Sequence, residues 1–279
     1  MDTVPTADAR RELAHFLASR RARLTPRDVG LATGRRRRVP GLRREEVAVL
    51  ANVSETWYTR LEQGQPINAS HDVLAAVAQA LCLDAHEREY LFMLAESLVH
   101  ASAAPPAAGD LPASLVTTLD ALTFAPAVVY GARWDVRLQN RAYVATFGDI
   151  ADVPIARGNV VRQVFLDPAR RTFFPEWEAV ARTLLQSFRV NAGRHVGDPA
   201  FAELIAELRA QSADFKAWWD EHDVVRRSIG EKRVNHPVVG ELVLDHVAFV
   251  LPERPDLTVI VYTAGRSSES ERKLRSLLD

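Results

Sequence analysis

One stretch of sequence decides the fold of the first part of the chain: Leu42–Gly64, LRREEVAVLANVSETWYTRLEQG. Its apolar residues, such as Val47 and Leu50, recur at helical spacing and predict a short helix. A turn is predicted at residues 52–53. A second helix follows Ser54, whose hydroxyl can accept hydrogen bonds from the free N–H groups of the first turn. Two short helices joined by a tight turn form a helix-turn-helix, whose second helix lies in the major groove of DNA.

The second helix of this motif would present polar side chains to base pairs. Glu55, Thr56 and Arg60 fall on its exposed face, and Tyr58 and Leu61 turn inward. Arginine can pair with guanine, glutamate can accept from cytosine, and threonine can contact the methyl group of thymine. Two arginines open the preceding helix, where the positive end of the helix dipole also favours phosphate. The residues predicted to contact DNA are Arg43, Arg44, Ser54, Glu55, Thr56, Trp57, Thr59 and Arg60, with core packing an equal alternative for Trp57.

A basic block precedes the motif. Residues 9–44 contain twelve arginines and two acidic residues, whereas the whole chain has a net charge of −1. A basic block on a nearly neutral chain is typical of polyanion-binding modules. Its centre lies in a glycine-rich insertion between the first helix and the motif, and predicts an arm that contacts phosphates or the minor groove. A solvated loop is the alternative. The arm consists of Arg35, Arg36, Arg37 and Arg38.

The chain changes character at residues 102–112, SAAPPAAGDLP, which are small, proline-rich and without periodicity. Such composition predicts a linker. Before it, apolar residues recur at helical spacing in five short helices without a strand candidate, so this part is expected to be an all-α bundle. The predicted organisation is a DNA-binding domain at 1–101, the linker at 102–112, a second domain at 113–266 and a C-terminal helix or tail at 267–279.

The second domain has a mixed pattern. Strands are expected first, then a long helical stretch over 160–222 that is broken at Pro168, at Gly193–Pro199 and at Ser212, and then strands again. This order predicts an α+β domain with a five-stranded antiparallel sheet. The expected strands are 127–131, 134–140, 228–235, 240–251 and 257–263.

The helix-turn-helix segment resembles the XRE-type repressors that are related to phage repressor and Cro proteins. Glu45–Ala48, Ser54, Tyr58 and Leu61–Gly64 match their pattern. The longer run RRRRVPGLRREEVAVLANVS, followed by WYTRLEQG, is similar to the actinobacterial MmyB-like subgroup. The resemblance implies that Glu62 braces the pair of helices rather than contacting DNA.

Three segments of the second domain resemble the ligand-binding domain of the same MmyB-like family. They are WDVRLQNRAY at Trp134–Tyr143, DPARRTFFPEWEAVA at Asp167–Ala181 and HPVVGELVLD at His236–Asp245. The resemblance implies a PAS-like fold and a fatty-acid-like ligand held between the sheet and the helices. Aromatic residues of the helical stretch are compatible with an apolar cavity, although core packing is the more frequent role of any one of them. The aromatic candidates for ligand contact include Phe165, Trp177 and Phe188.

A ligand that carries a carboxylate would need a cation or several hydrogen-bond donors in an otherwise apolar site. Asn140 closes the second predicted strand, Arg189 lies in the helical stretch, and His236 precedes a proline at a strand junction. These three residues, with Arg194 as a weaker fourth, are the candidates for binding the head group. Bracing of a loop or a helix end is an open alternative for each of them.

Several functional classes are disfavoured by the sequence. No P-loop, G-x-S-x-G or G-x-G-x-x-G pattern occurs after the linker, the histidines lack metal-ligand spacing, and Cys82 is the only cysteine. We therefore expect no catalysis, no metal and no cofactor, and a cytoplasmic, nucleoid-associated protein without membrane contact. The expected function is a transcriptional regulator that binds a double-stranded DNA operator as a homodimer and senses a small apolar or acyl ligand. The alternative is a second domain that only dimerises or binds a protein partner.

Overall fold

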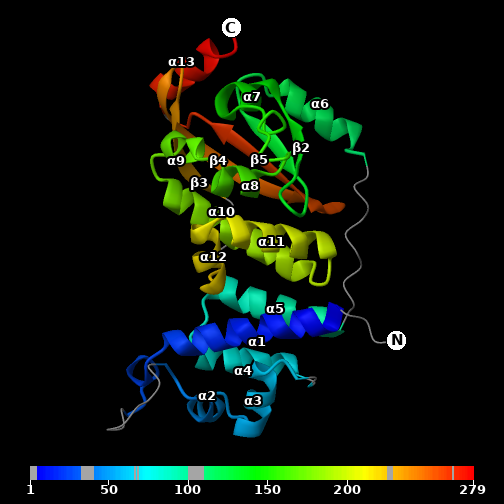
Figure 1. Cartoon of the computed structure of the whole chain (residues 1–279), viewed down its shortest axis with the longest axis vertical. Helices are drawn as coiled ribbons and strands as arrows, with labels where there is room; N and C mark the ends of the chain where they lie inside the picture. Colours follow the sequence, from blue (N-terminus) through cyan, green and yellow to red (C-terminus); the bar gives the residue numbers. More distant parts are fainter. Residues whose placement is uncertain are drawn as a thin grey trace. The chain divides into compact units, whose positions relative to one another are not determined.

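The computed structural model describes residues 5–32, 41–65, 67, 69–99, 110–224, 229–265 and 267–279 (Figure 1). The described residues form two compact units. The first takes its residues from Met1–Ala103, Ala192–Glu203 and Trp219–Val225, and the second from Ala104–Asn191, Leu204–Trp218 and Arg226–Asp279. The predicted arm Arg35–Arg38 and most of the predicted linker lie outside the described residues.

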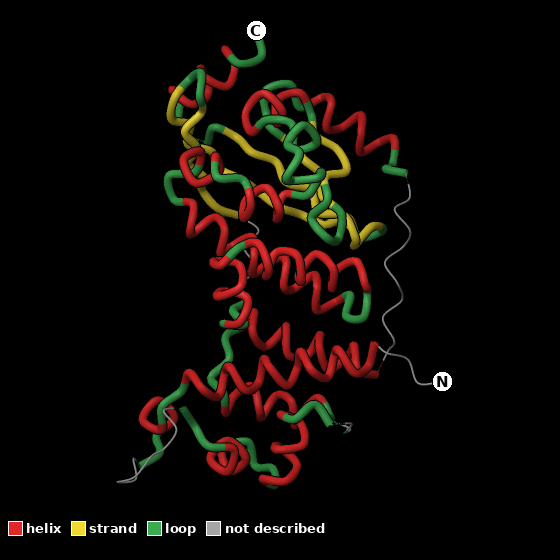
Figure 2. Tube along the Cα trace, in the orientation of Figure 1, coloured by secondary structure: helices red, strands yellow, loops and turns green. Residues whose placement is uncertain are grey.

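In the N-terminal part of the first unit, helices joined by loops and no strand are found among the described residues, as predicted (Figure 2). Ser54 and Ser70 cap helices by accepting hydrogen bonds from Trp57 N and Val73 N. Asp84 and Glu87 form the expected reciprocal capping box, with bonds of 2.8 and 3.1 Å. The elements are α1 (Pro5–Arg23), the 3-10 helix η1 (Pro26–Val29), α2 (Arg44–Leu50), α3 (Glu55–Glu62), α4 (His71–Ala80) and α5 (Ala85–Val99).

Two glycines allow the chain to pack closely around the helix-turn-helix. A Cβ atom on Gly41 would lie 2.6 Å from the Cα atom of Ala22, so only glycine fits where the chain enters α2. Gly64 has a φ of +65° just after α3, which confirms the predicted end of that helix. The turn between α2 and α3 contains Asn52 in the left-handed region at a φ of 53°, a conformation that asparagine tolerates better than most residues.

The second unit contains the predicted five-stranded antiparallel sheet, in the order β2-β1-β5-β4-β3. Leu242, Leu244 and His246 alternate onto one face of β4, as predicted, with the two leucines fully buried. The last strand begins earlier than expected, because the chain reverses at Pro252–Glu253. The strands are β1 (Ala127–Tyr130), β2 (Val136–Gln139), β3 (Ile229–His236), β4 (Gly240–Leu251) and β5 (Arg254–Thr263).

Helices cover both faces of this sheet. On one face, Leu115 and Leu119 of α6 pack against Ala127, Val129 and their neighbours on β5. Helices α7 to α10 supply the residues that face the other side of the sheet. The breaks predicted in the helical stretch at Pro168, at Gly193–Pro199 and at Ser212 all occur. Neither α6 nor α7 was predicted from the sequence. The helices are α6 (Ala113–Ala121), α7 (Arg141–Phe147), α8 (Val160–Leu166), α9 (Ala169–Phe173), α10 (Trp177–Arg194), α11 (Pro199–Gln211), α12 (Ala213–Asp220) and α13 (Ser268–Ser276).

Candidate DNA-binding surface and ligand pocket

Helix α3 presents a polar face over a buried one. Tyr58 is fully buried and Leu61 is 2% exposed, so these two side chains hold the helix against the bundle. Glu55, Thr56 and Arg60 are exposed, as the helical spacing predicted. Trp57 and Thr59 are half-buried at the edge of the same face. The structure thus brings together the side chains that the sequence assigned to base and backbone contacts, with their polar groups free to reach a groove.

An ion-pair cluster at the end of α3 fixes the helix-turn-helix. Glu62 is 5% exposed and accepts hydrogen bonds from Arg21 Nε at 2.6 Å and from Arg44 Nε at 2.9 Å. Burial raises the pKa of Glu62, but the hydrogen bonds and charges of these arginines outweigh it and hold the pKa below its usual value. Arg21 also donates to the carbonyl of Leu42, just before α2. The bracing role predicted for Glu62 is confirmed, and Arg21 is the partner that sequence reasoning missed.

The two arginines at the start of α2 have different surroundings. Arg44 belongs to the Glu62 cluster, although its side chain is still 43% exposed. Arg43 precedes the first helical residue and pairs with Glu45 at 3.0 Å, with 47% of its side chain exposed. Both arginines keep accessible surface, and their contacts with phosphate stay predictions.

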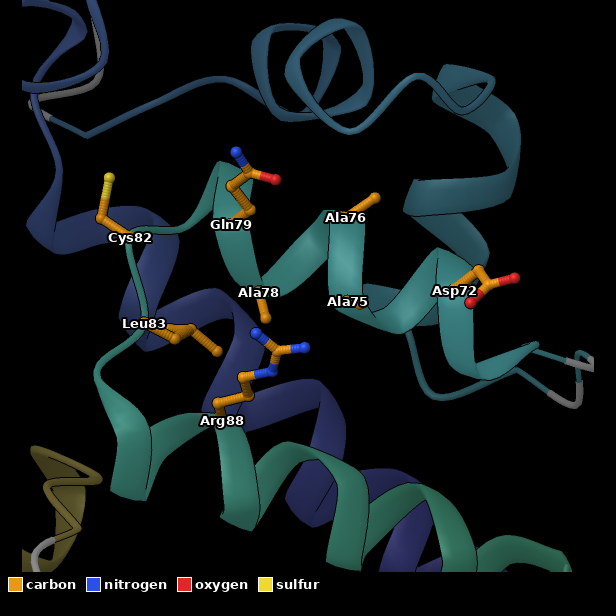
Figure 3. A pocket seen from close by; sticks show the side chains of 8 residues that line it. All are labelled: Asp72, Ala75, Ala76, Ala78, Gln79, Cys82, Leu83 and Arg88. Atoms are coloured by element: carbon orange, nitrogen blue, oxygen red, sulfur yellow. The ribbon is translucent and has the colours of Figure 1, made fainter.

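A hollow of about 600 Å³ lies on the surface of the helical bundle, along α4 and the start of α5 (Figure 3). Small side chains such as Ala75 and Ala76 line much of it, together with Gln79, Cys82 and Arg88. None of the residues predicted to contact DNA belongs to this hollow. It is therefore separate from the exposed face of α3.

The second unit contains a partly open pocket of about 240 Å³ between the sheet and helices α7 to α10. Strands β1, β3, β4 and β5 form one wall. A carboxylate at its edge, Glu176, is exposed to solvent, whereas most of the lining is apolar. This composition is typical of a site for a small organic ligand. Six aromatic residues line the pocket, namely Tyr130, Trp134, Tyr143, Phe147, Phe174 and Tyr262.

Polar groups lie at defined places on this aromatic wall. The hydroxyls of Tyr130 and Tyr143 share a hydrogen bond of 2.8 Å, and burial raises the pKa of both above the ordinary range. Arg170 is 8% exposed and donates to the carbonyl of Phe147 at 3.0 Å. Burial lowers the pKa of its guanidinium, which nevertheless stays charged. Burial and the charge of Lys232 lower the pKa of His246 to about 4, so this imidazole is neutral at pH 7.

None of the seven residues that the sequence suggested for ligand contact lines this pocket. Asn140 instead caps α7, with Oδ1 accepting from Ala127 N and Tyr143 N, and its Nδ2 donates to the carbonyls of Leu119, Leu122 and Ala125. Its amide is fully used within the fold, which agrees with the bracing alternative.

His236 also braces a turn. Its Nε2 lies 3.0 Å from the carbonyl of Ala145, and its Nδ1 accepts from the backbone N–H groups of Val238 and Val239. The Nε2–H tautomer follows from these bonds, because a carbonyl can only accept. Arg189 is buried in α10, and Arg194 ends α10 and belongs to the first unit.

Phe165, Trp177 and Phe188 lie in an aromatic cluster of the helical layer. The ring of Phe165 lies 5.1 Å from that of Phe215, and the ring of Trp177 lies 5.7 Å from that of Trp218. Trp177 Nε1 donates to the carbonyl of Val164, so its polar atom is satisfied. Val164, which accepts this bond, lines the pocket, and the ring contacts agree with the core alternative for these aromatics.

Sequence reasoning missed the polar residues that do line the pocket, among them Trp134, Gln163, Arg170 and Lys232. Trp134 and Arg170 stand within two of the segments that carried the family resemblance. Their separation along the chain gave no signal that they meet, because α8, α9, β3 and the loop between β1 and β2 come together only in the folded state.

Two further kinds of feature are absent from the described residues. No group of histidine, cysteine, aspartate or glutamate side chains there could hold a metal ion. No helix in the same part of the chain is long and apolar enough to cross a membrane.

Two family models match successive parts of the chain. Residues 111–277 match the family described as MmyB-like transcription regulator ligand binding domain, and residues 12–91 match the helix-turn-helix domain family. A comparison with curated proteins gave no match. The first match covers more than half of the chain and includes the whole pocket described above, and the second includes α3. The chain therefore belongs to the MmyB-like transcription regulators, with a DNA-binding helix-turn-helix domain followed by a ligand-binding domain.

Proposed function

We propose that this regulator binds its operator as a homodimer and that a small, fatty-acid-like ligand in the pocket of the second unit changes its affinity for DNA. The observation that carries the proposal is the aromatic pocket of about 240 Å³ in a domain of a transcription-regulator family. The free energy decreases when an apolar chain leaves water and fills an apolar cavity of this kind.

The DNA-binding part of the proposal rests on α3. Its exposed Glu55, Thr56 and Arg60 stand on a helix that is held from behind by Tyr58 and by the Glu62 cluster. Rigid support of this kind positions base-reading side chains accurately. The proposal needs two copies, because one helix-turn-helix reads one half-site and specific operators usually contain two half-sites about one helical turn apart.

The ligand can act on DNA binding only if it binds one arrangement of the dimer more tightly than another. We expect fatty acids between octanoate and palmitate to change operator affinity by about 1–3 kcal/mol, which corresponds to roughly 5- to 150-fold. The test is a fluorescence-anisotropy titration of the full chain against an operator that is selected from random DNA, with and without each acid. Sedimentation of the same complexes reports the number of chains bound.

Acid binding without a change in operator affinity would contradict the regulatory proposal. If no acid binds and the chain still forms dimers on DNA, the second unit serves dimerisation or a protein partner instead.

A further inference from the structure

Several buried hydrogen-bond donors on the pocket wall have no acceptor. Trp134 Nε1, Gln163 Nε2 and Arg170 Nε are buried without a hydrogen-bond partner, on side chains from residues that are 8%, 4% and 8% exposed. Buried polar groups are normally paired, and an unpaired donor loses its hydration without compensation. Three such donors around one cavity indicate that an acceptor-rich group belongs there.

The tyrosine pair adds to this excess of donors. One hydroxyl of Tyr130 and Tyr143 donates to the other across 2.8 Å, and the hydrogen of the second hydroxyl is left over to donate. The fourth buried polar atom without a partner on this wall is His246 Nδ1, which donates or accepts according to its tautomer. A ligand that only donated hydrogen bonds would leave the indole, amide and guanidinium donors unpaired.

Four charged residues line the pocket, and the two cations, Arg170 and Lys232, are less exposed than the two carboxylates, Glu176 and Glu231. Arg170 carries one positive charge, and Asp167 lies 3.5 Å from its Nε, close enough to offset part of that charge but too far for a strong hydrogen bond. A second charge comes from Lys232, whose Nζ lies 5.5 Å from the ring centre of Tyr262. The carboxylate of Glu231 is exposed and pairs with Arg233 at 3.1 Å, and Glu176 is also exposed. Donors and cations together favour a carboxylate over a neutral or basic group.

The size of the cavity limits the rest of the ligand. About 240 Å³ is slightly below the range of roughly 300–1,000 Å³ that is usual for pockets of drug-sized ligands. A medium-chain or ring-bearing acid fits this space better than an extended long chain.

We propose that the pocket binds a compact carboxylic acid whose carboxylate accepts hydrogen bonds from Gln163 and Trp134 beside the positive charge of Arg170. This inference deepens the proposed function and rests on it, because that function assigns a ligand to the pocket. Gln163 and Trp134 are the residues that set specificity, since they distinguish an acid from an alcohol of the same length.

The test compares three probes by calorimetric titration of the full chain in the absence of DNA: octanoate, 1-octanol and palmitate. Octanoate is expected to bind most tightly. The variants Gln163→Leu and Trp134→Phe should each weaken octanoate binding by about ten- to hundred-fold, because each removes a hydrogen bond to a charged group. Both should leave 1-octanol binding nearly unchanged.

Thermal unfolding of the ligand-free variants separates this role from a structural one. Gln163→Leu should not lower the Tm, because the donor that it removes has no partner in the fold. The matched control is Trp177→Phe, which removes an indole donor of equal exposure that is already bonded to Val164. This control should lower the Tm and leave the preference for octanoate over 1-octanol intact.

The inference is overturned if 1-octanol binds as tightly as octanoate, if both pocket variants keep full octanoate affinity, or if palmitate binds most tightly. Octanoate binding that fits the inference but leaves operator affinity unchanged would overturn only the regulatory function. An operator response to acids that persists undiminished in Gln163→Leu and Trp134→Phe would support that function and reject these head-group contacts.

Discussion

Asn140 and Gln163 are two amide side chains with almost equal burial, at 3% and 4% exposure. They differ in how far their hydrogen-bonding groups are paired within the fold. The amide of Asn140 joins the start of β1, the loop after α6 and the first turn of α7 through hydrogen bonds of 2.8–3.3 Å. The amide nitrogen of Gln163 has no partner. A polar residue that is satisfied inside the fold contributes to stability, whereas an unsatisfied one on a cavity wall is available to a ligand.

Replacement of Asn140 by alanine should therefore destabilise the second unit by about 3 kcal/mol or more, because it leaves several buried backbone groups unpaired at once. Urea unfolding, followed by tryptophan fluorescence, measures this decrease in stability. The control is Asn235→Ala, which removes one exposed amide with one bond to the carbonyl of Thr172. We expect less than about 1 kcal/mol from the control. Equal destabilisation in the two variants would show that Asn140 is not a central brace.

At the scale of one element, α3 combines two functions on opposite faces. Its inner face ends in Glu62, which ties Arg21 of α1 and Arg44 of α2 to the same carboxylate. Its outer face carries Glu55, Thr56 and Arg60. Because the inner contacts fix the position of the helix, the outer side chains can be changed while the fold is kept.

Arg60→Ala is expected to weaken specific operator binding by about 1–3 kcal/mol and to relax the choice of base at one position per half-site. Thermal stability should hardly change, because the side chain is exposed. Selection of preferred operators from random DNA, repeated for the variant, checks the specificity. Arg233→Ala, which removes an equal charge from the exposed side of β3, serves as the control and should leave the operator profile unchanged. An unchanged profile for Arg60→Ala would exclude this residue from base recognition.

At the scale of the whole molecule, the basic residues divide into those that pair within the fold and those that are left to bind phosphate. The twelve arginines of residues 9–44 stand against a net charge of −1 for the full chain. Several of them have structural partners, since Arg20 and Arg23 pair with Glu87 at 3.2 and 2.6 Å, and Arg21 pairs with Glu62. Only part of the basic block is thus left for phosphate, and the arm Arg35–Arg38 is its densest run.

Replacement of all four arginines of this arm by alanine should lower affinity for every DNA sequence alike. The slope of log K against log salt concentration should decrease by about 0.9 for each phosphate that the variant no longer binds, since each bound phosphate releases condensed counterions. Titrations of operator and random DNA at several salt concentrations measure both effects. If the slope equals that of the unchanged chain, the arm does not bind phosphates.

The sequence by itself determined the features that depend on neighbouring residues. Helical spacing, the caps at Ser54, Ser70 and Asp84, and the alternation in β4 are local, so the helix-turn-helix, most helix boundaries and the strands could be predicted. The polar face of α3 followed from the same periodicity. Helix α7 was missed because Asn140 ends a strand pattern and caps a helix at the same position.

Only the tertiary structure decided which side chains meet in the pocket. Gln163 of α8, Arg170 of α9 and Lys232 of β3 are distant in sequence, and each has a pattern that also suits an exposed or core position. Asn140 and His236 looked equally suited to a ligand until the structure showed backbone groups around them. Burial and pairing depend on contacts between distant segments, and local propensity carries no information about those contacts. The physical distinction between a brace and a binding site therefore arises only when the sheet and the helices pack together.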